Sequence, residues 1–279
     1  MIPPKTWVLI KGAGDLGTGV AARLWRCGFG VILAEIAEPT VIRRTVAFAE
    51  AVYAGRAVVE GIEARRVDGA ADVPESLRRG AIPVLVDPDG AIGRSLGPDV
   101  LVDATLSKRN VGTRLSDAPI VIALGPGFKA GVDAHAVVET NRGHDLGRVI
   151  LEGEAAPDTG VPGLIAGAGP ERVLRAPRDG RFLTTRAIGD RVEPGDVVGS
   201  VEGAPVVAAI GGILRGLLRS GLRVEAGVKL GDVDPRGIRG HCFTISDKAL
   251  AIAGGVLEAI FVCSRRTAAA APHAPLFDA

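Results

Sequence analysis

The chain has 279 residues, of which 47% are hydrophobic and only 4% aromatic, and its formal net charge is +1. This length favours two domains, and the near-neutral charge argues against a general nucleic-acid-binding surface. No apolar run approaches the roughly 18 residues of a membrane span, and the first residues lack the layout of a signal peptide. We therefore expect a cytoplasmic protein with no nucleic-acid and no membrane partner.

An apolar strand pattern at 6–11 leads directly into a glycine turn, Lys11-Gly12-Ala13-Gly14-Asp15-Leu16-Gly17. A helical pattern follows over 15–27, and a second apolar strand at 30–35 ends at Glu35. Together these form the dinucleotide-binding fingerprint, in which the glycines admit a pyrophosphate and the acid binds a ribose. The residues predicted to contact a cofactor are Gly12, Gly14, Asp15, Leu16, Gly17 and Glu35. The alternative is a turn that packs helix against strand and binds nothing.

Strand and helix patterns alternate through residues 1–152, which predicts an α/β fold with a Rossmann-like domain and a mainly parallel sheet. Further strands are expected at 83–86, 100–103 and 119–124. A hairpin is expected at 57–67, turning at Gly61. Helices are expected at 40–53, 73–80 and 131–140.

Residues 153–176 are rich in glycine and proline, which interrupt helices and strands, and this composition indicates a linker. In residues 177–236 the segment 189–195 repeats at 221–227, an offset of 32 residues, which predicts two copies of a short-strand unit. The pattern resembles the lipoyl/biotinyl carrier fold, an all-β barrel-sandwich, although its central hairpin contains no carrier lysine. A C-terminal helical segment is expected at 237–263 and a disordered tail at 264–279.

Three polar segments are candidates for ligand contacts. Lys108, Arg109 and Asn110 follow the strand at 100–103, where cations and an amide could neutralise and orient a phosphate. Glycines after the strand at 119–124 could turn backbone N–H groups toward an anion. The residues of that turn are Gly125, Pro126, Gly127 and Phe128. A solvated loop and a plain strand-to-helix turn are the respective alternatives.

The densest polar stretch is 139–148, which contains Asn141, Arg142 and His144. We expect these three side chains to contact a substrate or cofactor rather than to perform acid–base catalysis. Arg43 and Arg44 either meet a phosphate beyond a ribose or face solvent.

The cysteines, Cys27, Cys242 and Cys263, have neither metal-ligand spacing nor a plausible disulfide framework, so no metal site is predicted. Cys242 could carry sulfur or selenium, but a small buried hydrophobe is its default interpretation. Cys27 and Cys263 lie on apolar helix faces and are expected in the core.

Familiar catalytic motifs are missing, including the Ser-His-Asp order, the nucleophile elbow, HExxH and the P-loop lysine. The single tyrosine, Tyr53, forms no Tyr-x-x-x-Lys pair. The sequence therefore leaves open whether the protein is an enzyme. An NAD(P)-dependent oxidoreductase, holding NAD through Glu35, is one alternative, and a non-enzymatic scaffold of Rossmann-like fold is another.

Six segments carry a resemblance to a known family: GAGDLGTGVA, RRTVAFAEAV, DATLSKRN, ALGPGFKAGVD, ETNRGHDLGRV and SDKALAIAGGVLEAI. Over residues 7–262 the chain resembles the accessory proteins of selenium-dependent molybdenum hydroxylases, the YqeB-type family. This family is distantly similar to the XdhC-type accessory factors of xanthine dehydrogenase. The resemblance implies that the protein binds molybdopterin or its dinucleotide form and assists its modification or insertion. The implied partner is a molybdenum hydroxylase client enzyme, and a homo-oligomer remains open.

Overall fold

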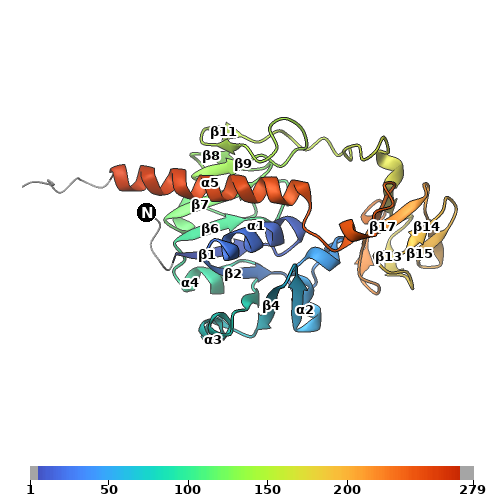
Figure 1. The fold of residues 1–279 in the computed structure, drawn as a ribbon, viewed down its shortest axis with the longest axis horizontal. Coiled ribbons are helices and arrows are strands. Elements are labelled where there is room, and N and C mark those ends of the chain that lie inside the picture. Colours follow the sequence, from blue (N-terminus) through green and yellow to red (C-terminus); the bar gives the residue numbers. More distant parts are fainter. Residues whose placement is uncertain (1–5, 271–279) are drawn as a thin grey trace, which may run out of the picture.

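A large mixed sheet with helices on both faces forms one lobe of the molecule, and a smaller lobe of antiparallel strands lies at one end (Figure 1). The structure is a computed structural model and describes residues 6–270. The chain enters the small lobe through a long connection that follows β11 (Gly153–Glu154) and returns through α5 (Asp247–Ala270), which lies across the large lobe.

Within residues 6–270, nine strands form the large sheet in the order β10-β9-β7-β6-β1-β2-β5-β4-β3. The seven strands from β9 to β4 run parallel, whereas β10 and β3 pair antiparallel at the two edges. Their bounds are β1 (Trp7–Lys11), β2 (Gly30–Glu35), β3 (Arg56–Val59), β4 (Ile62–Val67), β5 (Ile82–Val86), β6 (Val100–Asp103), β7 (Ile120–Leu124), β9 (Ala136–Val138) and β10 (Val149–Ile150). The short strand β8 (Lys129–Ala130) pairs separately with β11.

Both faces of this sheet are buried, because successive residues of each strand point to opposite sides. In β1, Val8 and Ile10 join the core beneath α1 and α5, whereas Leu9 joins a second core on the other face. The helices are α1 (Asp15–Arg26), α2 (Glu50–Ala54), α3 (Val73–Arg78), α4 (Ala91–Ser95) and α5. The short 3-10 turns are η1 (Arg44–Val46), η2 (Ala70–Asp72), η3 (Leu115–Asp117), η4 (Pro170–Arg172) and η5 (Arg239–Cys242).

The small lobe contains two four-stranded antiparallel sheets in the described chain, β12-β19-β17-β14 and β16-β15-β13-β18. The strands are β12 (Val173–Arg175), β13 (Gly180–Leu183), β14 (Arg191–Val192), β15 (Val197–Val201), β16 (Ala204–Val207), β17 (Gly212–Leu217), β18 (Arg223–Val224) and β19 (Lys229–Asp234). The strands β13, β14 and β15 recur as β17, β18 and β19, as the sequence repeat predicts. Each copy contributes its short middle strand to the sheet of the other.

The predicted fold class is wrong in two respects. The large sheet is mixed rather than parallel, because hairpins place β3 and β10 antiparallel at its edges. The strands after residue 172 form two separate four-stranded sheets, and the structure shows no carrier-type barrel-sandwich among the described residues. The same offset of 32 residues carries β12 onto β16, so each copy of the repeat contributes one such edge strand, and β12 lies inside the segment predicted to be a linker.

Several element predictions are confirmed and others are wrong. The structure confirms the five predicted strands, the helices at α1 and α3, and the hairpin at Gly61. The helix expected at 131–140 is wrong, because residues 136–138 pair with β7 as a buried strand. The helix expected at 40–53 is reduced to η1 and α2. Residues 264–270 extend α5 instead of forming a tail, and 271–279 lie outside the described residues.

Hydrogen bonds join the two lobes at Leu217 of the small lobe and at Ile42 and Arg44 of the large lobe. The N–H of Leu217 donates a hydrogen bond of 2.8 Å to the carbonyl of Ile42, and Nε of Arg44 donates to the carbonyl of Leu217 at 2.7 Å. A Cβ on Gly216 would lie 2.5 Å from Ile42 Cγ2, so only glycine permits this approach. No helix within residues 6–270 combines the length and apolarity needed to cross a membrane.

Two neighbouring glycines of α5 give a matched test of its packing on the sheet. A Cβ on Gly255 would collide with the carbonyl of Gly147, whereas one on Gly254 would meet nothing within 4 Å. Gly255→Ala should lower the free energy of unfolding by about 1–3 kcal/mol through overpacking. Gly254→Ala should raise it by up to about 1 kcal/mol, because alanine favours the helix. Denaturant unfolding measures both values, and equal effects would contradict the packing described.

Candidate functional site

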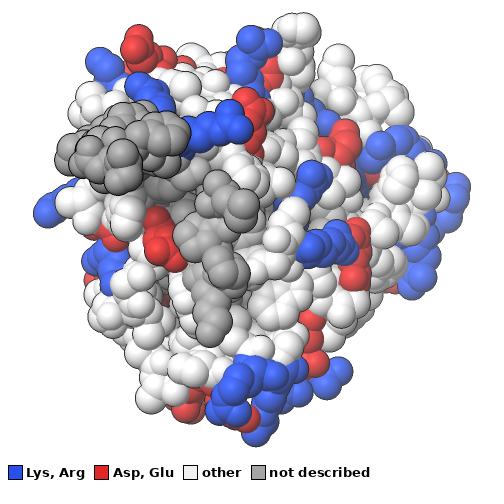
Figure 2. Space-filling model, turned by 60° about the vertical axis from the view of Figure 1, so that its left-hand side comes forward, with Lys and Arg blue, Asp and Glu red and all other residues white. Residues whose placement is uncertain are grey.

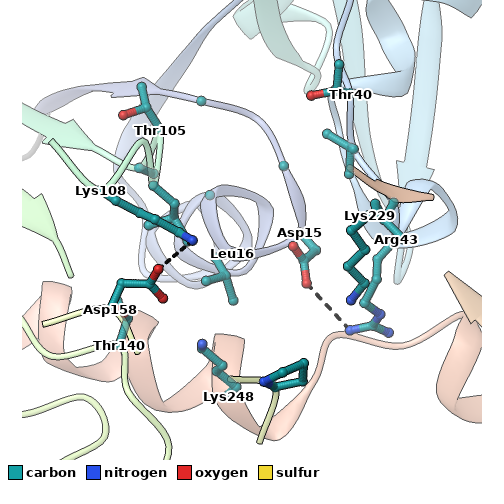
Figure 3. Close-up of a pocket in the computed structure, with 18 of the residues that line it drawn as sticks. Asp15, Leu16, Thr40, Arg43, Thr105, Lys108, Thr140, Asp158, Lys229 and Lys248 are labelled. Carbon is teal, nitrogen blue, oxygen red and sulfur yellow. Dashed lines mark ion pairs between the residues drawn. The ribbon is translucent and has the colours of Figure 1, made fainter. Parts of the chain in front are cut away.

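A cavity of about 770 Å³ lies between the two lobes. Its wall includes the glycine turn after β1, the loop after β6, the segment 156–163, strands of the small lobe and the start of α5. The strand order reverses direction between β1 and β6, and open α/β sheets bind ligands at such a point. Figure 3 looks onto the first turn of α1, with Lys108 and Asp158 on one side and Arg43 and Lys229 on the other.

The three glycines of the turn have different roles. Gly12 has φ +93°, and a Cβ there would lie 2.7 Å from the carbonyl oxygen of Ala104. A Cβ on Gly17 would collide with the carbonyl of Gly12, so these two glycines permit close packing. Gly14 instead lines the cavity, and its nearest neighbour would be Val41 Cγ2 at 3.7 Å. Because no side chain caps α1, its first N–H groups are available to an anion.

Glu35 supports the glycine turn from the end of β2. One carboxylate oxygen accepts a hydrogen bond of 2.8 Å from the N–H of Ala13, and the other accepts one of 2.8 Å from the N–H of Ile36. Burial raises the pKa of Glu35, and these two hydrogen bonds oppose that rise. Glu35 lines the cavity, so a ribose contact stays a prediction, but its carboxylate already holds the turn in place.

In the loop after β6, Lys108 reaches the cavity wall and its two predicted neighbours do not. Lys108 Nζ lies 2.6 Å from a carboxylate oxygen of Asp158, an ion pair that ties this loop to the segment 156–163. Asn110 shapes the loop, since it accepts hydrogen bonds from the N–H groups of Gly112 and Thr113 and donates to Asp133. Arg109 lies outside the cavity lining.

Of the turn after β7, Pro126 alone lines the cavity. A Cβ on Gly127 would lie 2.5 Å from the backbone nitrogen of Arg109, and one on Gly125 would lie 2.5 Å from Oγ1 of Thr140. These glycines let three loops pack closely. Phe128 is only 1% exposed and belongs to the core on the far face of the sheet.

Only part of the stretch 139–148 lines the cavity. Asn141 and Arg142 line the cavity, whereas His144 is exposed and lies outside its lining. The buried carboxylate of Glu139 builds the loop by accepting hydrogen bonds from three backbone N–H groups, those of Thr140, Asn141 and Ala156. Arg142 forms a two-point ion pair with Asp247 and lowers the pKa of that carboxyl to about 2.

Positive charge is concentrated in the cavity wall. The described lining contains four acidic residues and nine basic ones: Lys11, Arg43, Lys108, Arg142, Arg172, Arg175, Arg215, Lys229 and Lys248. The chain as a whole carries only +1, and both basic and acidic side chains are scattered over the face seen in Figure 2. Three of these cations, Lys11, Arg142 and Arg215, pair with Asp103, Asp247 and Asp234, which lie outside the lining. The remaining surplus favours an anionic ligand.

Three arginines of this wall have a buried Nε–H with no acceptor among the described residues: Arg43, Arg172 and Arg215. Arg215 is 7% exposed and donates no hydrogen bond to the described residues. Its one ion pair in the described chain, with Asp234, spans 3.6 Å. Burial and then the neighbouring charge of Arg43 lower the pKa of Arg215. A buried donor without an acceptor costs about 1–3 kcal/mol. A hydrogen-bond acceptor on a bound ligand would remove this cost at the Nε–H of Arg215.

Lys248, at the start of α5, is a second group that sequence reasoning did not select. Its side chain is half-buried in the cavity wall, and its Nζ has no partner among residues 6–270. Burial lowers the pKa of Lys248, and the positive charge of Arg142 lowers it further. The sequence places Lys248 only in the segment that caps the last helix, and no local motif there predicts a ligand contact.

Cys242 is buried and lies outside the cavity lining. Its thiol lies 3.7 Å from the carbonyl oxygen of Leu214, and burial raises the pKa of the Cys242 thiol. These properties are those of a core residue rather than of a reactive thiolate. The described residues contain no group of three or more His, Cys, Asp or Glu side chains arranged to hold a metal ion.

No protein-family model matches the chain. It is 51% identical over 255 residues to the uncharacterized protein YqeB of Escherichia coli strain K12, which covers 91% of this chain and 47% of the relative. This similarity supports a YqeB-type family. The chain spans about half the length of this relative.

Among solved structures, the chain is similar to an aspartoacylase family protein from Mesorhizobium loti, with 11% identity over 82% of this chain and 84% of that chain, at a TM-score of 0.24. The product-bound ectoine utilization protein EutE from Ruegeria pomeroyi matches with 13% identity over 82% and 85% of the two chains, at the same TM-score of 0.24. These low TM-scores add nothing to the fold, which rests on the sheet topology above.

The environment of Lys248 can be tested directly. The native pKa of its amine should lie below 10.5, and Arg142→Gln should raise it toward that value, because a like charge is removed while burial persists. Since the unfolded chain holds this proton more tightly, the stability contributed by Lys248 should increase as pH rises from the native pKa to 10.5. NMR of reductively methylated lysines measures the pKa.

Arg148→Gln is the control, because Arg148 pairs with Asp145 outside the cavity and should leave the pKa of Lys248 unchanged. A native pKa at or above 10.5, or equal shifts in both variants, would contradict the assigned environment.

Proposed function

We propose that this protein binds a phosphorylated, nucleotide-bearing cofactor in the cavity between its lobes and serves in the maturation of a molybdenum hydroxylase. The cofactor we propose is molybdopterin or its dinucleotide form. The observation that carries the binding proposal is the cavity at the uncapped N-terminus of α1, with nine basic and four acidic residues in its described wall. A pyrophosphate there would meet helix N–H groups and the positive end of the helix dipole.

The size and chemistry of the cavity suit such a ligand. Its volume of about 770 Å³ falls within the range of roughly 300–1,000 Å³ typical of small-molecule and cofactor sites. Gly14 leaves room for phosphate oxygens, and Lys108 and Lys248 supply positive charge beside the helix N-terminus (Figure 3). Lys248 has no competing protein partner among the described residues, whereas Lys108 would have to exchange Asp158 for the phosphate.

The molybdenum-hydroxylase part of the proposal rests on the family resemblance. Segments that carry this resemblance meet at the cavity, since Gly14, Pro126, Asn141 and Lys248 each come from a different one and all line its wall. The selenium-dependent role and the client enzyme follow from the resemblance alone. A maturation protein would need to hold its cofactor and release it to the client, which a cavity between two lobes permits.

A second candidate function is an NAD(P)-dependent oxidoreductase. The observation in its favour is the position of Glu35, which ends β2 and lines the cavity as a ribose-binding acid would.

Equilibrium titration of the purified protein with molybdopterin, its cytosine dinucleotide and NADH separates the two candidates. Tight binding of NADH without binding of either molybdopterin form would overturn the maturation proposal.

Gly14→Val should weaken cofactor binding by at least about tenfold, because the added side chain occupies the position of the phosphate. The native backbone at Gly14 has φ −62°, and a Cβ there has 3.7 Å of clearance, so the fold should tolerate the substitution. The control is Gly69→Val, at an extended glycine that has no neighbour within 4 Å and lies outside the cavity lining. Calorimetric titration and thermal unfolding measure the two effects. Unchanged binding in Gly14→Val would contradict the site.

A further inference from the structure

The wall contributed by the small lobe contains more positive charge than its own carboxylates neutralise. Arg172 donates a hydrogen bond of 3.0 Å to Asp232, which also lies 3.6 Å from Lys229 Nζ. Arg236, just outside the lining, holds Asp234 at two points, with distances of 2.9 and 2.6 Å. Asp234 is therefore already neutralised when Arg215 approaches it at 3.6 Å.

Arg43 adds a further cation from the large lobe. Its Nη1 lies 3.8 Å from a carboxylate oxygen of Asp15, the first residue of α1, and its Nη2 donates to the carbonyl of His241 at 2.9 Å. Arg43 therefore stands one side chain away from the glycine turn (Figure 3). The hydrogen bond between Leu217 and Ile42 holds Arg43 near Arg215, since Arg43 follows Ile42 and Arg215 lies two residues before Leu217.

Through these ion pairs, five described cations share three carboxylates. The cations are Arg43, Arg172, Arg215, Lys229 and Arg236, and the carboxylates are Asp15, Asp232 and Asp234. The surplus of two positive charges equals the charge of a phosphate monoester near neutral pH, which is about −1.5 to −2. Arg172 and Arg215 are each more than nine-tenths buried, line the cavity and keep an Nε–H without an acceptor.

We propose that Arg43, Arg172 and Arg215 form a second anion subsite, which takes a second anionic group of the ligand, with about two negative charges, while the glycine turn takes its phosphate. This inference rests on the proposed function for the first phosphate only. It specifies the ligand class as a compound with two separate anionic groups, bound across both lobes. Guanidinium groups suit this task, because their planar donors match phosphate oxygens and stay charged when buried.

The test uses the full-length protein, with inorganic phosphate as the first probe and a nucleoside 3′,5′-bisphosphate against the matching 5′-monophosphate as the second. In the unsubstituted protein, phosphate should raise the melting temperature more than chloride at equal ionic strength. The bisphosphate should bind at least about tenfold more tightly than the monophosphate if both phosphates are held. Stabilisation by free phosphate without this preference would assign the subsite to a separate phosphate ion and overturn the single-ligand proposal.

Arg215→Met should abolish the preference for the bisphosphate and leave binding of the monophosphate nearly unchanged. It should also raise the melting temperature of the ligand-free protein by about 2–4 °C, because a buried cation without a hydrogen bond is replaced by an apolar chain of similar length. Arg215→Lys, which keeps the charge, should retain part of the preference and serves if the methionine variant does not fold. Arg223→Gln, at an exposed arginine of the same lobe outside the lining, is the matched control.

The two proposals fail differently. If Gly14→Val removes binding of the monophosphate while Arg215→Met and Arg215→Lys leave the bisphosphate preference intact, the second subsite is wrong and the first stands. If neither phosphate compound depends on Gly14 but phosphate stabilisation still depends on Arg215, the proposed cofactor site is wrong and the arginine subsite stands as a site for a single ion. An equal loss in Arg223→Gln would show a general charge effect and overturn the subsite.

Discussion

The close approach of three backbone segments at the first glycine turn is the constraint on which the site depends. β1 is held between β2 and β6, with Lys11 in register with Ala34 on one side and Asp103 on the other. The next residue, Gly12, therefore faces Ala104 at a distance that no Cβ could occupy. Because Gly17 meets the carbonyl of Gly12 in the same way, α1 must start at this point with its N–H groups toward the cavity. The position we propose for the phosphate thus follows from strand register and from the absence of side chains at Gly12 and Gly17.

The second wall of the cavity depends on a contact of the same kind. Gly216 lets β17 approach Ile42, and the hydrogen bond from Leu217 to Ile42 fixes the distance between the lobes. The residues beside this contact are Arg43 in one lobe and Arg215 in the other. A backbone contact therefore brings the half-buried cation of Arg43 close to the buried cation of Arg215, and the two repel each other. Such an arrangement lowers the stability of the empty protein and is expected where a ligand supplies the missing negative charge.

The parts of the fold that the sequence predicts are those decided locally. Apolar strands, the glycine turn and the 32-residue repeat are visible in short windows, and their positions in the structure agree. The sequence pattern predicts helix at residues 136–138, because a three-residue buried strand has no periodicity of its own and only pairing with β7 defines it. The antiparallel edges also depend on distant partners. Gly14, Asn141 and Arg142 lie in local sequence motifs, so they could be predicted to line the cavity. Arg215 and Lys248 could not, because only distant contacts bring them to the cavity wall.

The glycine turn and the small lobe contribute different kinds of positive group to the cavity wall. The glycine turn offers backbone N–H groups, which bind an anion without placing a full charge in the interior. The small lobe instead presents guanidinium groups, whose burial is costly unless an anion accompanies them. A protein that needed only to hold its lobes together would be more stable with apolar residues at these positions. The retention of Arg172 and Arg215 in a buried wall, with donors left unused, is therefore better explained by a ligand that reaches the small lobe than by folding alone.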